Sequence, residues 1–225
     1  MLRNTRGAGG ENTARSVTRS FFTVIAALAF TSAGFAQVAF GPAITATQNL
    51  HGRFRQERHL KGITATLTSS GTFVLAPGKG LIWRIEEPIQ TITVITPAGI
   101  RQIVNGSEVQ RIEASRAPVI THFYDMLNGA LTGDWSAMHH DFAVKTTGDR
   151  RAWRTTLTPL RATDPIVGML SSVVIVGGSM VDSVDITRAN GDSERLTFLD
   201  QAISDVPLSV GDTLLLSNNE IIPTD

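Results

Sequence analysis

The sequence predicts a mainly β protein with a few short helices. Apolar and polar residues alternate with period two in many runs, as in an antiparallel sheet that buries one face. Asn190-Gly191-Asp192 separates two such runs and favours a tight hairpin, because Asn-Gly supplies the positive φ that the turn needs. Helical periodicity is scarce. Many strands in order with a few helices suggest a strongly bent sheet covered by helices on one side, although periodicity alone also allows a sandwich.

The alternating runs place the expected strands. They are residues 53–58, 64–69, 71–75, 81–85, 91–96, 108–112, 143–146, 152–157 and 172–176, with 184–187 and 195–198 forming the hairpin. Pro77-Gly78-Lys79-Gly80 marks a reversal between two of them. Residues 213–216 also have a strand-like pattern.

Three segments have helical character. They are residues 43–50, residues 117–131 and a short turn from Asp164 to Leu170. In the longest, apolar residues recur at spacings of three and four, and Pro118 stands where a helix tolerates it. In the shortest, Asp164 is a plausible N-cap before Pro165.

The first residues have the pattern of a signal peptide. Four arginines precede the apolar stretch 21–30, and Gly34-Phe35-Ala36 offers a cleavage site before Gln37. The apolar stretch is shorter than the roughly 20 residues that span a membrane. We therefore expect residues 1–36 to be a signal peptide and residues 37–225 to be one exported, periplasmic domain.

Charge and cysteine content exclude several classes of function. Removing four arginines and one glutamate from 20 basic and 20 acidic residues leaves 16 and 19, a net charge of about −3. This balance gives no reason to expect nucleic acid as a partner. The chain has no cysteine, which excludes disulfides, thiolate metal sites and an acylated lipobox cysteine. We expect a freely soluble mature protein.

The order of motifs from Phe54 onward resembles the LolA family of lipoprotein carriers. Phe54-x-Gln56 is followed by a glycine-led strand from Gly71 to Pro77, then by Trp83, Pro88 and the apolar strand 91–94. The family reads Phe-x-Gln, a glycine-led strand, a basic residue with proline, an aromatic-Trp strand, proline and an apolar strand. Leu157-Thr158-Pro159 and the Asn190-Gly191-Asp192 hairpin match later family positions. The resemblance covers residues 43–198.

This resemblance implies an unclosed antiparallel β half-barrel with a helical lid over a hydrophobic cavity. It implies a periplasmic chaperone, without enzymatic activity or cofactor, that shields the acyl chains of lipoproteins on their way to the outer membrane. Its partners would be the acylated lipoprotein or another acyl lipid, an inner-membrane donor complex and an outer-membrane acceptor. We expect a monomer.

Alternation and the resemblance together select the side chains expected to line the acyl-chain cavity. Ordinary core packing is an equally good interpretation of each of them. They are Phe73, Leu75, Leu81, Trp83, Ile85, Ile92, Val94, Phe123, Met126, Leu127, Trp153 and Leu157, of which Phe123, Met126 and Leu127 would form the lid face.

Two departures from the family keep other cargoes open. The basic residue beside the family's proline, which latches the lid, is Ala76 here, and Lys79 is a nearby substitute. The tail from Ala202 does not match the family's ending. A carrier of a different acyl lipid is therefore an alternative, as is a lipid-sensing regulatory domain, although the 189 residues left after removing 36 of 225 argue against the second domain that such a sensor usually has.

Other chemistry has weak signals. Met138-His139-His140-Asp141 contains zinc-ligand types, but adjacent residues rarely point at one ion. The sequence 177–181 breaks a Gly-x-Ser-x-Gly elbow at its last position, and Gly78-Lys79-Gly80 lacks the other residues of a phosphate-binding loop. We expect no metal and no catalytic residue.

Overall fold

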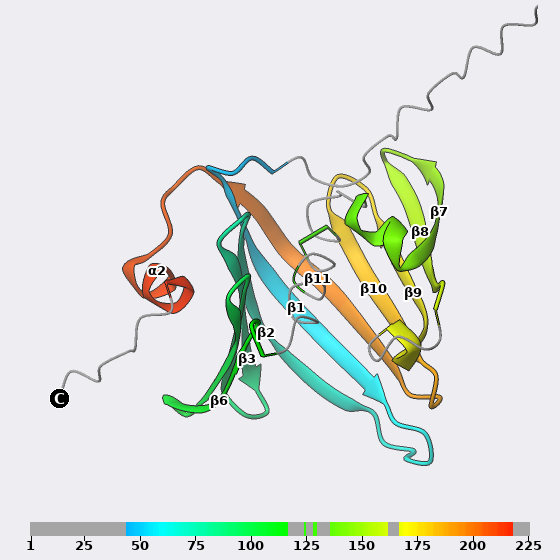
Figure 1. Ribbon diagram of the computed structural model, residues 1–225, viewed down its shortest axis with the longest axis horizontal. Coiled ribbons are helices and arrows are strands. Elements are labelled where there is room, and N and C mark those ends of the chain that lie inside the picture. The colour runs from blue at the N-terminus through cyan, green and yellow to red at the C-terminus, as the bar shows by residue number, and fades with distance from the viewer. Residues whose placement is uncertain (1–43, 117–123, 125–127, 130–135, 162–166, 218–225) are drawn as a thin grey trace, which may run out of the picture. The chain divides into compact units, whose positions relative to one another are not determined.

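Eleven antiparallel strands form one open sheet in the computed structural model (Figure 1). The strand order is β6-β5-β4-β3-β2-β1-β11-β10-β9-β8-β7, so β6 and β7 are the edges and the sheet is not closed into a barrel. The structure describes residues 44–116, 124, 128–129, 136–161 and 167–217, all within the unit Val38–Asp225.

The strand bounds follow the chain in two groups. The first group is β1 (Asn49–His59), β2 (Leu67–Ala76), β3 (Gly80–Glu87), β4 (Thr91–Thr96), β5 (Gly99–Val104) and β6 (Ser107–Glu113). The second is β7 (Phe142–Asp149), β8 (Ala152–Pro159), β9 (Leu170–Gly177), β10 (Val181–Arg188) and β11 (Ser193–Ser204). Two 3₁₀ turns, η1 (Ser136–His140) and η2 (Val167–Met169), and the helix α2 (Val210–Leu216) complete the described elements.

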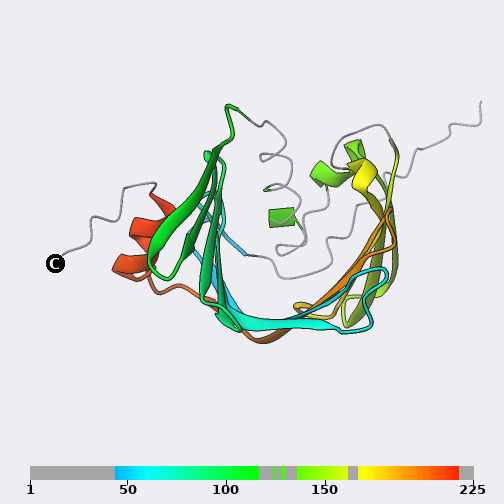
Figure 2. The same ribbon diagram turned by 90° about the horizontal axis from the view of Figure 1, so that it is seen from below.

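The sheet is strongly curved. Figure 2 shows β3–β6 and β7–β10 rising on either side of β1, β2 and β11. We call the face that carries Phe54, Phe73 and Trp83 the inner face, and the face that carries Ile82 and Val94 the outer face. The buried residues of the two faces form separate apolar clusters, and the helix α2 covers the cluster of the outer face (Figure 2).

Most of the predicted strands are confirmed. The prediction for residues 91–96 coincides with β4, and the predicted hairpin joins β10 to β11. At its turn, Gly191 has φ +93° and donates its N–H to the carbonyl of Arg188 at 3.0 Å. The predicted strands 64–69 and 71–75 are one strand, β2, and β5 was missing from the prediction.

The predictions for the helical segments were less accurate. The predicted helix 43–50 is wrong, because β1 begins at Asn49 and Leu50 pairs with Leu75 of β2. The predicted strand 213–216 is also wrong, because these residues belong to the helix α2. The turn predicted from Asp164 ends in η2, and its first residues lie outside the described ones. Most of residues 117–131 lie outside them too, although Tyr124, Asn128 and Gly129 are helical.

The helix α2 is tied to the outer face by charged contacts as well as by packing. Leu215 joins the outer cluster of Ile82, Val94 and Ile103. Arg84 of β3 pairs with Asp212, and the guanidinium of Arg101 donates to the carbonyl of Leu215. Arg101 is 3 % exposed, and burial is the largest of the causes that lower its pKa. The helix therefore makes the outer face of β3–β5 a second buried surface.

Replacing Asp212 with asparagine is expected to lower the free energy of unfolding by about 1 kcal/mol. The N-cap residue Ser209 accepts the N–H of Asp212 at 3.0 Å, and its hydroxyl donates back to the Asp212 carboxylate at 2.8 Å. The change removes the charge that faces Arg84. Urea denaturation measures the loss, with Asp205→Asn at an exposed position as the control expected to leave the midpoint unchanged. Equal midpoints for the two variants would contradict this account of how α2 is attached.

The substitution Glu108→Gln is expected to destabilise the protein near neutral pH and to have a smaller effect in acid. Hydrogen bonds from Arg111, at 2.7 and 2.8 Å, are the largest cause that lowers the pKa of Glu108 below its ordinary value of 4.5. A lowered pKa stabilises the fold above pH 4.5, and that contribution is lost as the pH falls through the folded-state value. Because the pair is partly exposed, the cost at about pH 7 should stay below about 1 kcal/mol, and it should diminish as the pH is lowered below 4.5. Urea midpoints of both proteins, measured at about pH 7 and at a series of lower pH values, check this. A difference independent of pH would contradict it.

Candidate functional site

Four aromatic rings meet at the centre of the inner face. The ring centroids of Phe54 and Trp83 are 3.7 Å apart and the rings are stacked. Phe73 lies 6.0 Å from Trp83 and packs edge-on against Phe198 at 5.4 Å. These residues come from β1, β2, β3 and β11, which are neighbours in the sheet. The contacts give the middle of the inner face a rigid, strongly apolar floor.

Glycines on neighbouring strands make room for the rings of Phe73 and Trp153. A Cβ at Gly52 would lie 2.9 Å from Cε1 of Phe73, and one at Gly177 would lie 2.7 Å from Cζ2 of Trp153. Trp153 also donates its indole N–H to the carbonyl of Gly178 at 2.8 Å. A side chain at Gly52 or Gly177 would therefore displace the ring beside it.

Apolar side chains stand in register across the inner face. In an antiparallel sheet, directly opposed residues point to the same side, so a row of partners is a continuous surface. One such row runs over seven strands from β6 to β11. It consists of Ile112, Ile100, Ile95, Leu81, Leu75, Leu50 and Ile203. A second row, on β7 to β10, consists of Val144, Leu157, Val173 and Ile186.

The segment between β6 and β7 contributes to this cluster. Tyr124 and Met138 are 5 % and 2 % exposed and belong to the inner cluster, and Ile44 packs against it from the start of the described chain. The inner face is thus not a bare surface: residues that follow β6 in the sequence cover part of it.

The predicted cavity residues separate into three groups. Most of them lie in or against the inner cluster, and whether they contact an acyl chain stays a prediction. These are Phe73, Leu75, Leu81, Trp83, Ile85, Trp153 and Leu157. The predicted lid residues Phe123, Met126 and Leu127 lie outside the described residues.

Ile92 and Val94 require a correction. Val94 pairs with Ile82 and Ile92 pairs with Arg84, which places both on the outer face, and the outer cluster includes them together with Leu215 of α2. The residues of β4 that share the side of Trp83 are Thr91, Thr93 and Ile95. We therefore remove Ile92 and Val94 from the proposed acyl-chain wall.

A charged group at one end of the inner face was not predicted. Along β1 and β11 the inward positions change from Phe54 and Phe198 at the centre to Arg58 and Glu194 near the hairpin turns. Glu194 is 8 % exposed and lies 3.4 Å from Arg58 and 3.5 Å from Arg188 of β10. The signal in the sequence was a charge at a position where the alternation calls for an apolar residue.

The histidine cluster has a local partner. Nδ1 of His140 lies 2.6 Å from the Asp141 carboxylate, and His140 is mostly exposed. Within the described ranges, no group of three His, Cys, Asp or Glu side chains is arranged to hold a metal ion. Those ranges also contain no helix with the length and apolar character that crossing a bilayer requires.

No protein-family model and no curated protein matches the sequence. Among solved structures, the chain is similar to a LolA superfamily protein of Nitrosomonas europaea, at 12 % identity over 77 % of this chain and 92 % of that one, with a TM-score of 0.41. It is also similar to a domain of Vibrio parahaemolyticus assigned provisionally to outer membrane lipoprotein sorting, at 10 % identity over 77 % and 93 % of the two chains, with a TM-score of 0.40.

A third similar structure is the MucA/MucB complex of Pseudomonas aeruginosa. Identity is 14 %, the TM-score is 0.42, and the match covers 75 % of this chain but only 56 % of that one. The strand order itself shows that the chain is an open antiparallel β-sheet protein.

Proposed function

We propose that the chain is a carrier that shields acyl chains from water on the inner face of its open sheet. The observation that carries this proposal is the single apolar cluster that runs over β1–β4 and β7–β11, with four aromatic rings at its centre. Side chains that pack the core of such a sheet also form the wall against which a bound chain would lie.

The energetics favour such a surface. Burying a methylene group stabilises by about 0.8 kcal/mol, so about ten methylenes would contribute about 8 kcal/mol. A membrane buries the same methylene groups equally well, so the free energy of moving an acyl chain from the membrane to the carrier would be close to zero. A donor and an acceptor must then give the transfer its direction. The motif resemblance implies both: an inner-membrane donor complex and an outer-membrane acceptor.

Two cargoes are compatible with this surface. The order of motifs favours an acylated lipoprotein in transit between the inner and the outer membrane. The alternative, a free acyl lipid, is favoured by Ala76, which replaces the family's basic latch and is only 4 % exposed at the end of β2. A lysine or arginine at so buried a position would need a partner for its charge.

The proposal includes export. The arginines and the apolar stretch that precede residue 37 support a cleaved signal peptide, and with it a periplasmic place of action and a domain of residues 37–225. Amino-terminal sequencing of the protein recovered from the periplasm tests this part separately, and Gln37 is the expected first residue.

Native mass spectrometry of the full chain, purified from the cell envelope without detergent, tests the carrier function. Bound acyl lipid or acylated peptide is the expected result, together with uptake of acylated peptide from micelles. A protein that is recovered empty and takes up no acylated ligand would overturn the proposal.

A further inference from the structure

We propose that Arg58 and Arg188, held together by Glu194, bind the anionic head of the acyl cargo. This inference rests on the proposed carrier function and chooses between its two cargoes. It assigns as cargo a free acyl lipid that ends in a phosphate or a carboxylate, in preference to an acylated lipoprotein.

Two of the three charged side chains, Glu194 and Arg58, continue an apolar row, and Arg188 lies two residues beyond Ile186, a member of that row on β10. From β8 to β1, the directly opposed residues on the inner face are Leu157, Val173, Ile186, Glu194 and Arg58. Neighbouring strands are about 4.8 Å apart, so the charges lie within one or two strands of the apolar wall. An acyl chain lying along the wall would bring its head group to this end.

The contacts of Glu194 leave the arginines available. Its Oε1 accepts a 2.6 Å hydrogen bond from Gln56, whose own side-chain oxygen accepts from Ser69 at 2.8 Å. Its Oε2 faces both guanidiniums, at 3.4 Å from Nε of Arg58 and 3.5 Å from Nη2 of Arg188. Both distances exceed the 2.7–3.2 Å range, roughly, of an N–H···O hydrogen bond.

The local charge balance favours an incoming anion. Two guanidiniums converge on one carboxylate oxygen, and each guanidinium has five N–H donors in a fork that fits phosphate or carboxylate. Glu194 is buried, whereas the side chains of Arg58 and Arg188 are 45 % and 39 % exposed. The carboxylate holds two like charges together, and their outward donors are open to a ligand.

Asp192 is a second carboxylate close to this pair, and it competes weakly for it. Its Oδ1 accepts the backbone N–H of Lys61 at 2.8 Å and its Oδ2 accepts from Asn190 at 2.8 Å. The Lys61 bond is the first cause that lowers the pKa of Asp192, and the charges of Arg188 and Arg58 come last. The Asp192 carboxylate thus interacts mainly with Lys61 and Asn190 and only weakly with the two arginines.

The chemistry of the head group separates the candidate cargoes. A fatty acid carries a carboxylate and a phospholipid carries a phosphate, and either forms charge-assisted hydrogen bonds with arginine. The acylated cysteine of a lipoprotein bears its chains on an uncharged thioether-linked glycerol. Two arginines at the end of the apolar row therefore favour the anionic lipid.

Binding of matched lipid pairs to the full chain tests the inference. The pairs are dipalmitoyl phosphatidic acid against dipalmitoylglycerol, and palmitate against hexadecanol, which differ only in the charged head. We expect the charged member of at least one pair to bind with about tenfold higher affinity or more. The pair that shows this preference identifies the head group as a phosphate or a carboxylate. In Arg58→Gln/Arg188→Gln the preference should disappear while the uncharged lipids bind as before.

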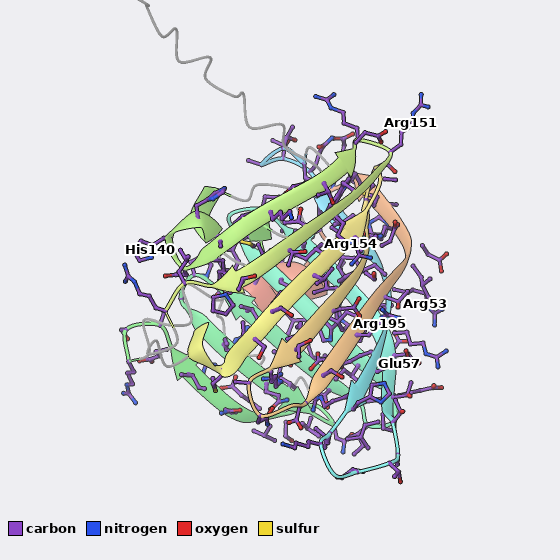
Figure 3. All side chains as sticks on the ribbon, turned by 90° about the vertical axis from the view of Figure 1, so that its right-hand side faces the viewer. Arg53, Glu57, His140, Arg151, Arg154 and Arg195 are labelled. Carbon is purple, nitrogen blue, oxygen red and sulfur yellow. The ribbon has the colours of Figure 1, made fainter. Side chains whose placement is uncertain are left out.

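Two further variants exclude a general loss of charge or of structure. Arg53→Gln/Arg154→Gln removes the same charge from exposed positions on the outer face, which Figure 3 views, and should keep the preference. Glu194→Gln keeps a side-chain oxygen between the two arginines and removes only the competing charge, so this variant should retain the preference. Loss of the preference in Glu194→Gln as well would indicate a purely structural ion pair and would overturn the inference. Equal binding of both members of each pair would overturn the inference while leaving the carrier function intact. Failure to bind any of the four lipids would also overturn the inference, and only if acylated peptide is not taken up either would the carrier function itself be overturned.

Discussion

Replacing Gly71 with valine is expected to lower the free energy of unfolding by about 3 kcal/mol or more. A Cβ at this position would lie 1.8 Å from the carbonyl oxygen of Arg84 and 3.0 Å from Cα of Ile85. Both are backbone atoms of β3, so no side-chain rotation relieves the overlap. The pairing of β2 with β3 shifts register between Ser70 and Gly71, and this close approach is part of that irregularity. Urea denaturation followed by circular dichroism measures the effect.

Gly211→Ala provides the matched control. Its nearest atom would be Oγ of Ser209 at 3.9 Å, so the methyl group has space. In the helix α2, alanine should stabilise by up to about 1 kcal/mol relative to glycine. A Gly71→Val protein with the urea midpoint of the wild type would show that β2 and β3 do not approach as closely as described.

Replacing Trp83 with aspartate is expected to abolish retention of acyl cargo, with at least a tenfold loss of affinity. The indole is stacked on Phe54 and lies within 6.2 Å of Phe198, so the carboxylate would stand at the centre of the apolar floor. Neither an acyl chain nor the neighbouring rings could solvate it. Lipid extracted from the purified variant, counted per mole of protein, measures the effect.

Three companion variants separate binding from folding. Trp83→Leu keeps the surface apolar and should retain cargo. Thr197→Asp places the same charge on the outer face, opposite Arg55, and should also retain it. If the aspartate variant does not fold, as judged by circular dichroism, Trp83→Gln takes its place. A folded Trp83→Asp or Trp83→Gln protein with normal cargo would remove Trp83 from the proposed wall.

The strands of the inner face could be predicted from the sequence because their alternation is clear. Phe54 stands between Arg53 and Arg55, so the alternation in this strand has only one consistent apolar face. The Asn190-Gly191 turn likewise has one favourable geometry, and β10 and β11 pair around it.

The helix α2 explains several of the errors. Because it covers the outer face of β3–β5, that face is apolar as well, and alternation no longer tells inside from outside. Ile92 and Val94 therefore followed the pattern of inward residues while packing beneath Leu215. The strand β5 was missed for the same reason, since Arg101 is buried and Ile103 faces the helix.

A signal for α2 itself was present in the sequence. Ser209 and Asp212 have the spacing of a capping box. The backbone N–H of Asp212 donates to the Ser209 hydroxyl oxygen as such a box requires, and the Asp212 carboxylate accepts from the Ser209 hydroxyl instead of from its backbone N–H. The three leucines that follow fit a buried strand or a helix equally well, which is why the strand was predicted. The contact of Arg58 with Glu194 lay beyond prediction, because it depends on which strands β1 pairs with.

Photo-crosslinking locates the acyl chain most directly. A palmitoyl lipid with a diazirine at the end of its chain, bound to the full protein and irradiated, marks the residues that it touches. The account predicts labelled peptides from the inner cluster, at Phe54, Phe73, Trp83 or Leu157. Labelling confined to Ile82, Val94 and the helix α2, or none above that of a protein denatured before irradiation, would contradict it.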